Sequence, residues 1–246
     1  MATIEQGIVQ PVAGRHTPKL GPLAIMAATE ADFQDLRSRM DLPNECKLLL
    51  SRICYRQADP GKPSLVGPVM GAPYAVMLME VLHAWGIHEM LFYGWCGSTS
   101  SAIRSGDILL PDGAVIDEGT SRHYQQETGA TVHPQDGLRS VLKDALESRS
   151  VPLHSGLVWT TDGIFRETPS RVKWFQAQGA VAVDMELSAL ISAALFLDIA
   201  LASVLLVSDE LFDLQWHPGF KSGEFKASRT LVCDLLSQIN GNWFHG

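Results

Sequence analysis

Two acidic side chains in this chain follow apolar segments, where a carboxyl group could carry chemistry. Glu186, in Val-Asp-Met-Glu (183–186), enters an otherwise apolar predicted helix, where an unpaired carboxylate is costly. A carboxylate only accepts hydrogen bonds, so at a strand-to-helix junction it can bind two sugar hydroxyls at once. The alternative is that Glu186 pairs with an arginine or caps a neighbouring element, and the local sequence leaves both open.

The second candidate is Asp209, in Ser-Asp-Glu (208–210), which follows the apolar predicted strand 202–207. Polar groups at the carboxyl end of such a strand face a cleft. If burial or hydrogen bonding raises its pKa, Asp209 can donate a proton to a leaving purine. A helix N-cap or a turn is the alternative role for the same residue.

Weaker candidates lie in loops. Predicted strand 89–93 runs into Gly-Trp-Cys-Gly-Ser (94–98), which we expect to be a turn whose Gly94 and Gly97 expose backbone N–H groups to an anion or a sugar. Trp95 either lines the same pocket or fills the core.

Two further segments add candidates for substrate binding. Phe165, in residues 161–167, can stack on a base, and Arg166 beside it is a further candidate. His123, in Thr-Ser-Arg-His-Tyr (120–124), can reach a ribose hydroxyl. A lone histidine or phenylalanine is more often a packing residue, so these signals are weak.

The elements that position these residues alternate between strands and helices, which predicts an α/β layered domain. Thr29 is expected to cap the first helix, with Asp32 at the capping-box position. The expected strands are 23–28, 47–57, 64–69, 89–93, 106–116, 155–161, 180–183 and 200–207, and the expected helices are 29–40, 74–85, 133–148, 168–178, 184–197 and 222–239.

Length and composition limit the class of protein. The 246 residues contain no linker-like composition shift, which predicts a single domain over 1–246 with residues 1–20 as an N-terminal extension. A formal net charge of -8 argues against a nucleic-acid partner. The four cysteines form no C-x-x-C pair, and we expect no metal or organic cofactor and a reducing, cytoplasmic location.

One apolar stretch, 187–207, is about long enough to cross a bilayer. Asp198 interrupts it near the middle, so a buried helix followed by a buried strand is the simpler interpretation. We therefore expect no membrane partner, and the absence of a basic segment followed by an apolar one in residues 1–19 predicts no secretory signal.

Three ordered motifs resemble the nucleoside phosphorylase superfamily, which includes purine nucleoside phosphorylases, uridine phosphorylases and methylthioadenosine nucleosidases. They are Gly-Trp-Cys-Gly-Ser (94–98) with Ile-Arg-Ser-Gly-Asp-Ile-Leu-Leu-Pro (103–111), Val-Asp-Met-Glu-Leu-Ser-Ala-Leu (183–190), and Val-Ser-Asp (207–209). The resemblance extends over about residues 23–236. It implies a twisted mixed central sheet partly closed into a barrel and flanked by helices. It also implies a homo-oligomer, either dimer-based with active-site residues shared between subunits, or a trimer or a hexamer.

The same resemblance implies roles for individual residues. Met185 and Glu186 would hold the ribose, Asp209 would be the general acid toward a purine N7, and Phe165 would line the base pocket, with His123 a weaker pocket candidate. Uridine phosphorylases lack an aspartate at the position of Asp209, so a purine-type base is favoured.

The departures from the family pattern concern phosphate. Family phosphorylases carry arginines in Gly-Asp-Pro-x-Arg and Arg-x-Gly-Ser, whereas the corresponding stretches here, 27–32 and 92–95, contain no arginine, and Trp95 replaces the phosphate-binding serine. Phosphorolysis would need another cation, such as Arg52, Arg104, Arg122 or an arginine of a neighbouring subunit.

The resembling nucleosidases instead keep an acidic residue in the first loop, and here Glu30 and Asp32 qualify as the base that activates water. The sequence thus predicts cleavage of a nucleoside N-glycosidic bond. Transfer to phosphate as co-substrate is favoured, and hydrolysis or nucleoside binding without turnover are the alternatives.

Overall fold

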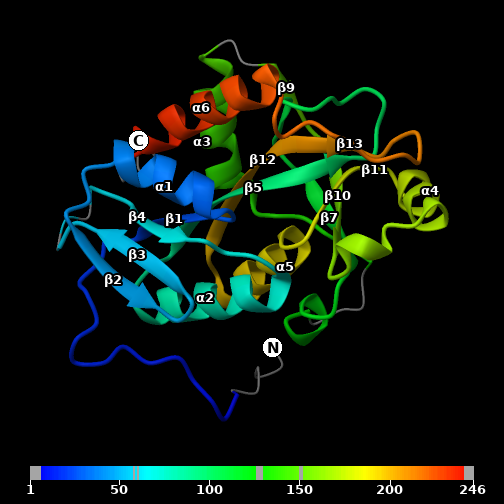
Figure 1. Ribbon diagram of the computed structural model, residues 1–246. Coiled ribbons are helices and arrows are strands. Elements are labelled where there is room, and N and C mark those ends of the chain that lie inside the picture. The colour runs from blue at the N-terminus through cyan, green and yellow to red at the C-terminus, as the bar shows by residue number, and fades with distance from the viewer. Residues whose placement is uncertain (1–6, 58, 60, 126–129, 150–151, 241–246) are drawn as a thin grey trace.

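The computed structural model describes residues 7–57, 59, 61–125, 130–149 and 152–240. At its centre, strand β5 (Glu89–Ser98) has three partner strands (Figure 1). β12 (Ala200–Glu210) pairs in parallel along the whole of one side. On the other side, β1 (Leu23–Ala27) pairs with residues 89–93, and β11 (Ala180–Asp184) pairs in antiparallel fashion with Gly97 and Ser98. The change of neighbour along β5 leaves an opening between β1 and β11.

Two arms of the sheet extend from this point. The first continues from β1 through β4 (Ser64–Gly67) and β3 (Ser51–Tyr55) to β2 (Asn44–Leu48). The second continues from β11 through β10 (Leu157–Thr161) and β7 (Gly113–Asp117) to β8 (Thr131–Val132). Three short strands lie off this path: β6 (Ile108–Leu109), β9 (Leu153–His154) and β13 (His217–Pro218). β6 and β13 pair with β12, and β9 pairs with β6.

The mixed sheet and its flanking helices confirm the fold class expected from the sequence, but the expected partial closure into a barrel is wrong. Among the strands that the structure describes, the pairings branch at β5 and β12 and no ring of pairings closes. The reason is that each arm ends on a strand that pairs on one side alone, namely β2 and β8.

Helices cover both faces of the sheet (Figure 1). α2 (Ala72–Ala84) and α5 (Leu187–Leu197) pack against each other on one face. The other face is covered by α1 (Glu30–Arg39), α3 (Asp136–Glu147) and α6 (Gly223–Ser237), whose apolar residues form a second core cluster with the strands. α4 (Pro169–Ala177) packs beside β11, and two short 3₁₀ turns, η1 (Ser121–His123) and η2 (Ile164–Arg166), lie in loops.

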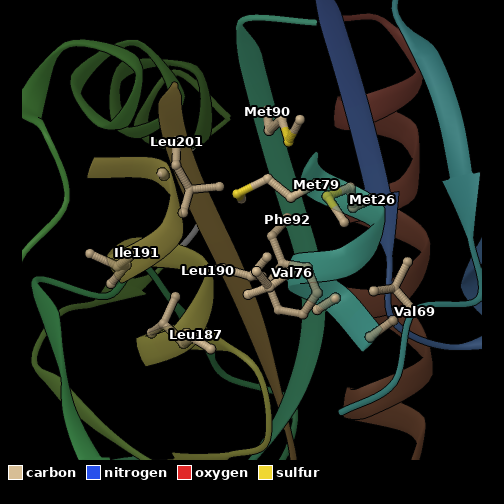
Figure 2. Packing of buried hydrophobic residues seen from close by; sticks show 14 of the residues in the cluster. Met26, Val69, Val76, Met79, Met90, Phe92, Leu187, Leu190, Ile191 and Leu201 are labelled. Carbon is tan, nitrogen blue, oxygen red and sulfur yellow. The ribbon is translucent and has the colours of Figure 1, made fainter. Parts of the chain in front are cut away.

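The core cluster that includes α2 and α5 is the larger of the two. Figure 2 shows Leu190 of α5 beside Val76 of α2, and Met79, Leu187 and Ile191 belong to the same core cluster. All residues of α5 from 187 to 194 are buried. The helix ends because Asp198 takes a left-handed conformation, with φ 57°, and β12 follows directly. No helix in the described part of the chain is long and apolar enough to cross a membrane, so the alternative of a span over 187–207 is wrong.

Two of the expected strands differ from the structure. The strand expected over 47–57 is the second half of the hairpin β2–β3, because Leu49 adopts a left-handed φ of 56° and reverses the chain. The strand expected over 106–116 is divided into β6 and β7, which pair with different strands. The N-terminal extension forms no helix or strand over residues 7–22, and residues 1–6 lie outside the described residues.

The third difference bears on function, because residues 94–98 are not a turn. They continue β5, since β12 pairs with every residue up to Ser98. The glycines allow close packing in the strand: a Cβ on Gly94 would lie 2.9 Å from the Phe92 ring, and one on Gly97 would lie 2.5 Å from Cδ1 of Leu211. Substitution at either position would force the neighbouring side chains to move.

Candidate functional site

A cavity of about 580 Å³ lies where β5 changes its neighbour from β1 to β11. Ligands bind at such points in open α/β sheets because the loops that follow the strands diverge there. The carboxyl ends of β1, β5, β11 and β12 and the segment around η2 all contribute. The lining residues are Ala28, Thr29, Met70, Trp95, Cys96, Gly97, Ile164, Phe165, Glu167, Val183, Asp184, Met185, Glu186, Ser208, Asp209, Leu211, Trp216 and Phe220.

The junction between β11 and α5 forms the inner wall. Asp184 ends β11, and its Oδ2 accepts the backbone N–H groups of Glu186 at 3.0 Å and Leu187 at 2.7 Å. Its Oδ1 accepts the hydroxyl of Thr160 at 2.6 Å. An acidic side chain suits this position, because the first N–H groups of a helix have no partner within the helix and carry partial positive charge. Asp184 is therefore fully engaged in holding the junction.

Glu186 lies at the same junction and is only 5% exposed. Its Oε1 accepts the backbone N–H of Gly71 at 2.6 Å. Gly71 precedes α2 and has a φ of 85°, which favours glycine. Glu186 thus lies between the N-termini of α2 and α5, yet burial raises its pKa, and the carboxyl of Asp184 raises it further. Most of its hydrogen-bonding capacity remains available to a ligand.

Asp209 lies on β12 across the cavity. The pairing of β12 with β5 shifts register between Val207 and Asp209, and such a shift redirects side chains locally. Ser208 donates its hydroxyl to Oδ1 of Asp209 at 2.5 Å, and the indole N–H of Trp216 donates to Oδ2 at 2.9 Å. Burial raises the pKa of Asp209 in spite of these two hydrogen bonds. The carboxyl group is accordingly easier to protonate than an exposed aspartate.

Glu167 is a further carboxyl group in this cavity, and no pattern in the sequence selected it. It follows η2, the turn that also places Ile164 and Phe165 in the lining. Burial raises the pKa of Glu167 to about 7, and the negative charge of Asp209 contributes to the shift. Its position after an irregular turn explains why hydrophobic periodicity could not find it.

The chain matches a known family over most of its length. A family model described as the phosphorylase superfamily matches residues 22–239. The chain belongs to the phosphorylase superfamily. A DeoD-type purine nucleoside phosphorylase from Bacillus cytotoxicus is 27% identical over 150 residues, which are 61% of this chain and 64% of the relative. The first curated relatives are matched over only 52% to 64% of their own lengths.

Solved structures extend the likeness over the whole fold. The crystal structure of the purine nucleoside phosphorylase from Toxoplasma gondii, in complex with immucillin-H, has a TM-score of 0.81 at 18% identity and covers 98% of each chain. The AMP nucleosidase from Bacteroides thetaiotaomicron has a TM-score of 0.70 at 21% identity and covers 88% of each chain. At these identities the likeness shows the fold, which phosphorylases and nucleosidases share.

In this member of the phosphorylase superfamily, most of the residues selected from the sequence line one cavity: Asp209, Glu186, Met185, Phe165, Trp95 and Gly97. Phe165 is 95% exposed, which places it at the mouth. Trp95 packs edge-on against Phe225 of α6. Their roles in binding or catalysis remain predictions.

Three other selected residues lie outside the lining. A Cβ on Gly94 would face Phe92 and Leu205, so this glycine serves the packing of the strand. Arg166 is exposed although its neighbours in η2 line the cavity. His123, in η1, is also exposed and does not line the cavity.

The two candidates for a hydrolytic base also lie outside the lining. Glu30 is exposed and pairs with Arg52. Asp32 is completely buried, where it accepts the Thr29 hydroxyl at 2.6 Å and a guanidinium N–H of Arg229 at 2.6 Å. Thr29 accepts the backbone N–H of Asp32 in return, as the sequence predicted for the N-cap of α1. In this arrangement Asp32 holds the start of α1 and does not reach the cavity.

The cavity is also poor in positive charge. Among the described residues that line it there is no arginine, lysine or histidine. Of the cations considered for phosphate, Arg52 pairs with Glu30 and Arg104 pairs with Glu210 at 2.9 Å. Arg122 is exposed next to His123. The lining that the described residues of this chain form is thus acidic and apolar.

We predict that Glu186→Gln stabilises the free protein. Because burial raises the folded-state pKa of Glu186 above the unfolded value of about 4.3, ionisation of this group costs stability as the pH rises above that value. Urea unfolding should show a gain of ~1–3 kcal/mol for the variant at pH 8 and a smaller gain at pH 5.

The matched control is Glu147→Gln, because Glu147 is exposed on α3 beside Lys143. It should change stability by less than about 0.5 kcal/mol at both pH values. A loss of stability in Glu186→Gln, or an equal effect at both pH values, would contradict the assignment of Glu186 as a buried carboxyl group with a raised pKa.

Proposed function

We propose that this protein cleaves the N-glycosidic bond of a purine-type nucleoside. The observation that carries the proposal is the pair of carboxyl groups across one cavity, Glu186 and Asp209, which have different environments. Two acidic groups with distinct partners can divide the work of holding a sugar and protonating a leaving group. Membership of the phosphorylase superfamily supports the same chemistry.

Glu186 binds the sugar in this scheme. One oxygen already accepts the N–H of Gly71, which fixes the direction of the carboxyl group. The remaining lone pairs accept the 2′ and 3′ hydroxyls of ribose, and Met185 packs beside the sugar. Hydroxyl donors lower the cost of a buried negative charge, so ligand binding favours the ionised form of Glu186.

Asp209 protonates the base. A purine leaves more easily when N7 is protonated, and burial raises the pKa of Asp209, so this carboxyl group holds a proton up to a higher pH than an exposed aspartate does. Ser208 and Trp216 each donate to one oxygen of Asp209 and orient the group. As the base departs, the ribosyl group becomes cationic, and the surrounding carboxyl groups stabilise that charge.

The relatives favour phosphate as the acceptor of the ribosyl group, as in a phosphorylase. Phosphate recognition normally uses charge-assisted hydrogen bonds from cations, and the described lining of one subunit supplies none. A neighbouring subunit of a homo-oligomer would then contribute the cation. The N-terminus of α1, capped by Thr29 in the lining, can accept part of the negative charge.

Hydrolysis is the second candidate, and the lack of a cation in the described lining is the observation that favours it. Water needs no positive site, and an acidic cavity disfavours an anionic acceptor. Neither Glu30 nor Asp32 is placed to activate that water in this arrangement. A hydrolase of this design would thus rely on stabilisation of the ribosyl cation by its carboxyl groups.

Replacing Asp209 tests the general acid. Asp209→Asn keeps the shape of the side chain but cannot deliver a carboxyl proton, so kcat for inosine should fall by about 10²–10⁴-fold. Asp213→Asn is the matched control, because Asp213 lies in the exposed loop after β12 and pairs with His217. The rate of base release is measured by chromatography for each variant. Equal activity of the wild type and Asp209→Asn would show that Asp209 is not the general acid.

The products formed with and without phosphate show whether phosphate or water accepts the ribosyl group. We expect release of the base to require phosphate and to yield ribose 1-phosphate, as transfer to phosphate demands. Mass spectrometry of the sugar product measures this directly. Free ribose formed at the same rate without phosphate would replace phosphorolysis with hydrolysis, and nucleoside binding without base release would indicate a binding protein.

A further inference from the structure

Glu167 is a carboxyl group in the cavity that the proposed mechanism does not use. In the described part of the chain, no hydrogen bond or ion pair engages its side chain, although Asp184, Glu186 and Asp209 all have defined partners. Arg166 beside it is exposed, and Arg171 of α4 pairs with Asp117 instead. A half-buried carboxyl without a partner is costly, so a ligand that supplies one would bind favourably.

The electrostatics place Glu167 at one end of the cavity. The charge that perturbs it is that of Asp209, and Asp184 and Glu186 make no resolved contribution. The charge of Asp184 instead raises the pKa of Glu186 across the β11–α5 junction, and the charge that raises the pKa of Asp184 is that of Glu118. Glu167 therefore lies at the Asp209 end, which the proposed function assigns to the base, and the sugar lies at the Glu186 end.

The edge of a purine matches two adjacent carboxyl groups. N7 and the substituent at position 6 lie side by side on that edge, and the substituent is a donating amino group in adenine and an accepting oxygen in guanine. With Asp209 at N7, the next group along the edge meets Glu167. An ionised carboxylate accepts from the amino group, whereas a neutral carboxyl donates to the oxygen.

We propose that Glu167 binds the 6-substituent of the purine, and that its protonation state selects between 6-oxo and 6-amino nucleosides. This inference rests on the proposed function, because it needs Asp209 to face N7. Phe165 from the same turn lies over the mouth, where it can cover the base.

The preference between 6-oxo and 6-amino purines is expected to change with pH. Below the Glu167 pKa of about 7 the neutral carboxyl favours a 6-oxo purine, and above it the carboxylate favours a 6-amino purine. The other ionisable groups of the described lining are Asp184, Glu186 and Asp209. Titration of Asp184 and Glu186, at the sugar end, acts on both substrates alike and cancels when two nucleosides are compared as a ratio. The charge of Asp209 acts on Glu167, and the variant Glu167→Gln, which keeps Asp209, separates the two effects.

The test measures kcat/KM for adenosine and for inosine at pH 6 and pH 8. The ratio of adenosine to inosine should rise by at least about tenfold, because the ratio of ionised to neutral Glu167 rises ~100-fold over two pH units. In Glu167→Gln the ratio should not change with pH, because an amide both donates and accepts without titrating. Glu147→Gln, on the exposed face of α3, should keep the wild-type profile.

A flat ratio in the wild type, or an unchanged pH dependence in Glu167→Gln, would overturn the assignment of Glu167. If the wild type releases no base from either nucleoside, the proposed function fails separately. Glu167 is then tested by calorimetry with free adenine and hypoxanthine at the same two pH values. A shift of preference toward adenine at pH 8 that is lost in Glu167→Gln supports its role, and its absence in the wild type refutes it.

Discussion

The rest of the site depends on two carboxyl groups, Asp184 and Glu186, buried at the junction between β11 and α5. A buried carboxylate is costly, and two side by side are more so. The Thr160 hydroxyl and two N–H groups at the start of α5 donate to Asp184 and offset that cost, so Asp184 serves the structure of the junction. Glu186 accepts the N–H of Gly71 at the start of α2, and a backbone hydrogen bond from Met185 also stabilises its charged form, but no side chain donates to it among the described residues. The difference between them makes Glu186 the residue that a hydroxyl-bearing ligand can satisfy.

The sheet makes room for this ligand by changing partners along one strand. β5 pairs first with β1 and then with β11, and the gap between those neighbours becomes the cavity. Gly97 has no side chain, so Leu211 and Asp209 can lie close to the backbone of β5. The pairing of β12 with β5 shifts register between Val207 and Asp209, in the same region, and this shift changes the direction of the Asp209 side chain. α2, which follows Gly71, and α5, which follows Glu186, pack against each other on one face of the sheet (Figure 2).

Local patterns in the sequence predicted the alternating elements, the Thr29 cap and the buried helix α5, because each depends on neighbouring residues. They did not predict that 94–98 continue as a strand, since that depends on β12, about a hundred residues away. Glu167 was missed because its importance comes from the charge of Asp209, which no local pattern contains. Glu30 and Asp32 were selected by their place in the first loop, but arginines from β3 and α6 engage both.

The most direct measurement compares kcat/KM for inosine with that for its 2′,3′-dideoxy analogue. If the ribose hydroxyls complete the hydrogen bonds of Glu186, the analogue leaves a buried carboxylate unsatisfied, and kcat/KM should fall by about 10²-fold or more. The same comparison in Glu186→Gln should show a much smaller difference, because the charge is gone. Equal kcat/KM for the two nucleosides in the wild type would contradict the central claim that the buried carboxyl at the β11–α5 junction is a sugar site.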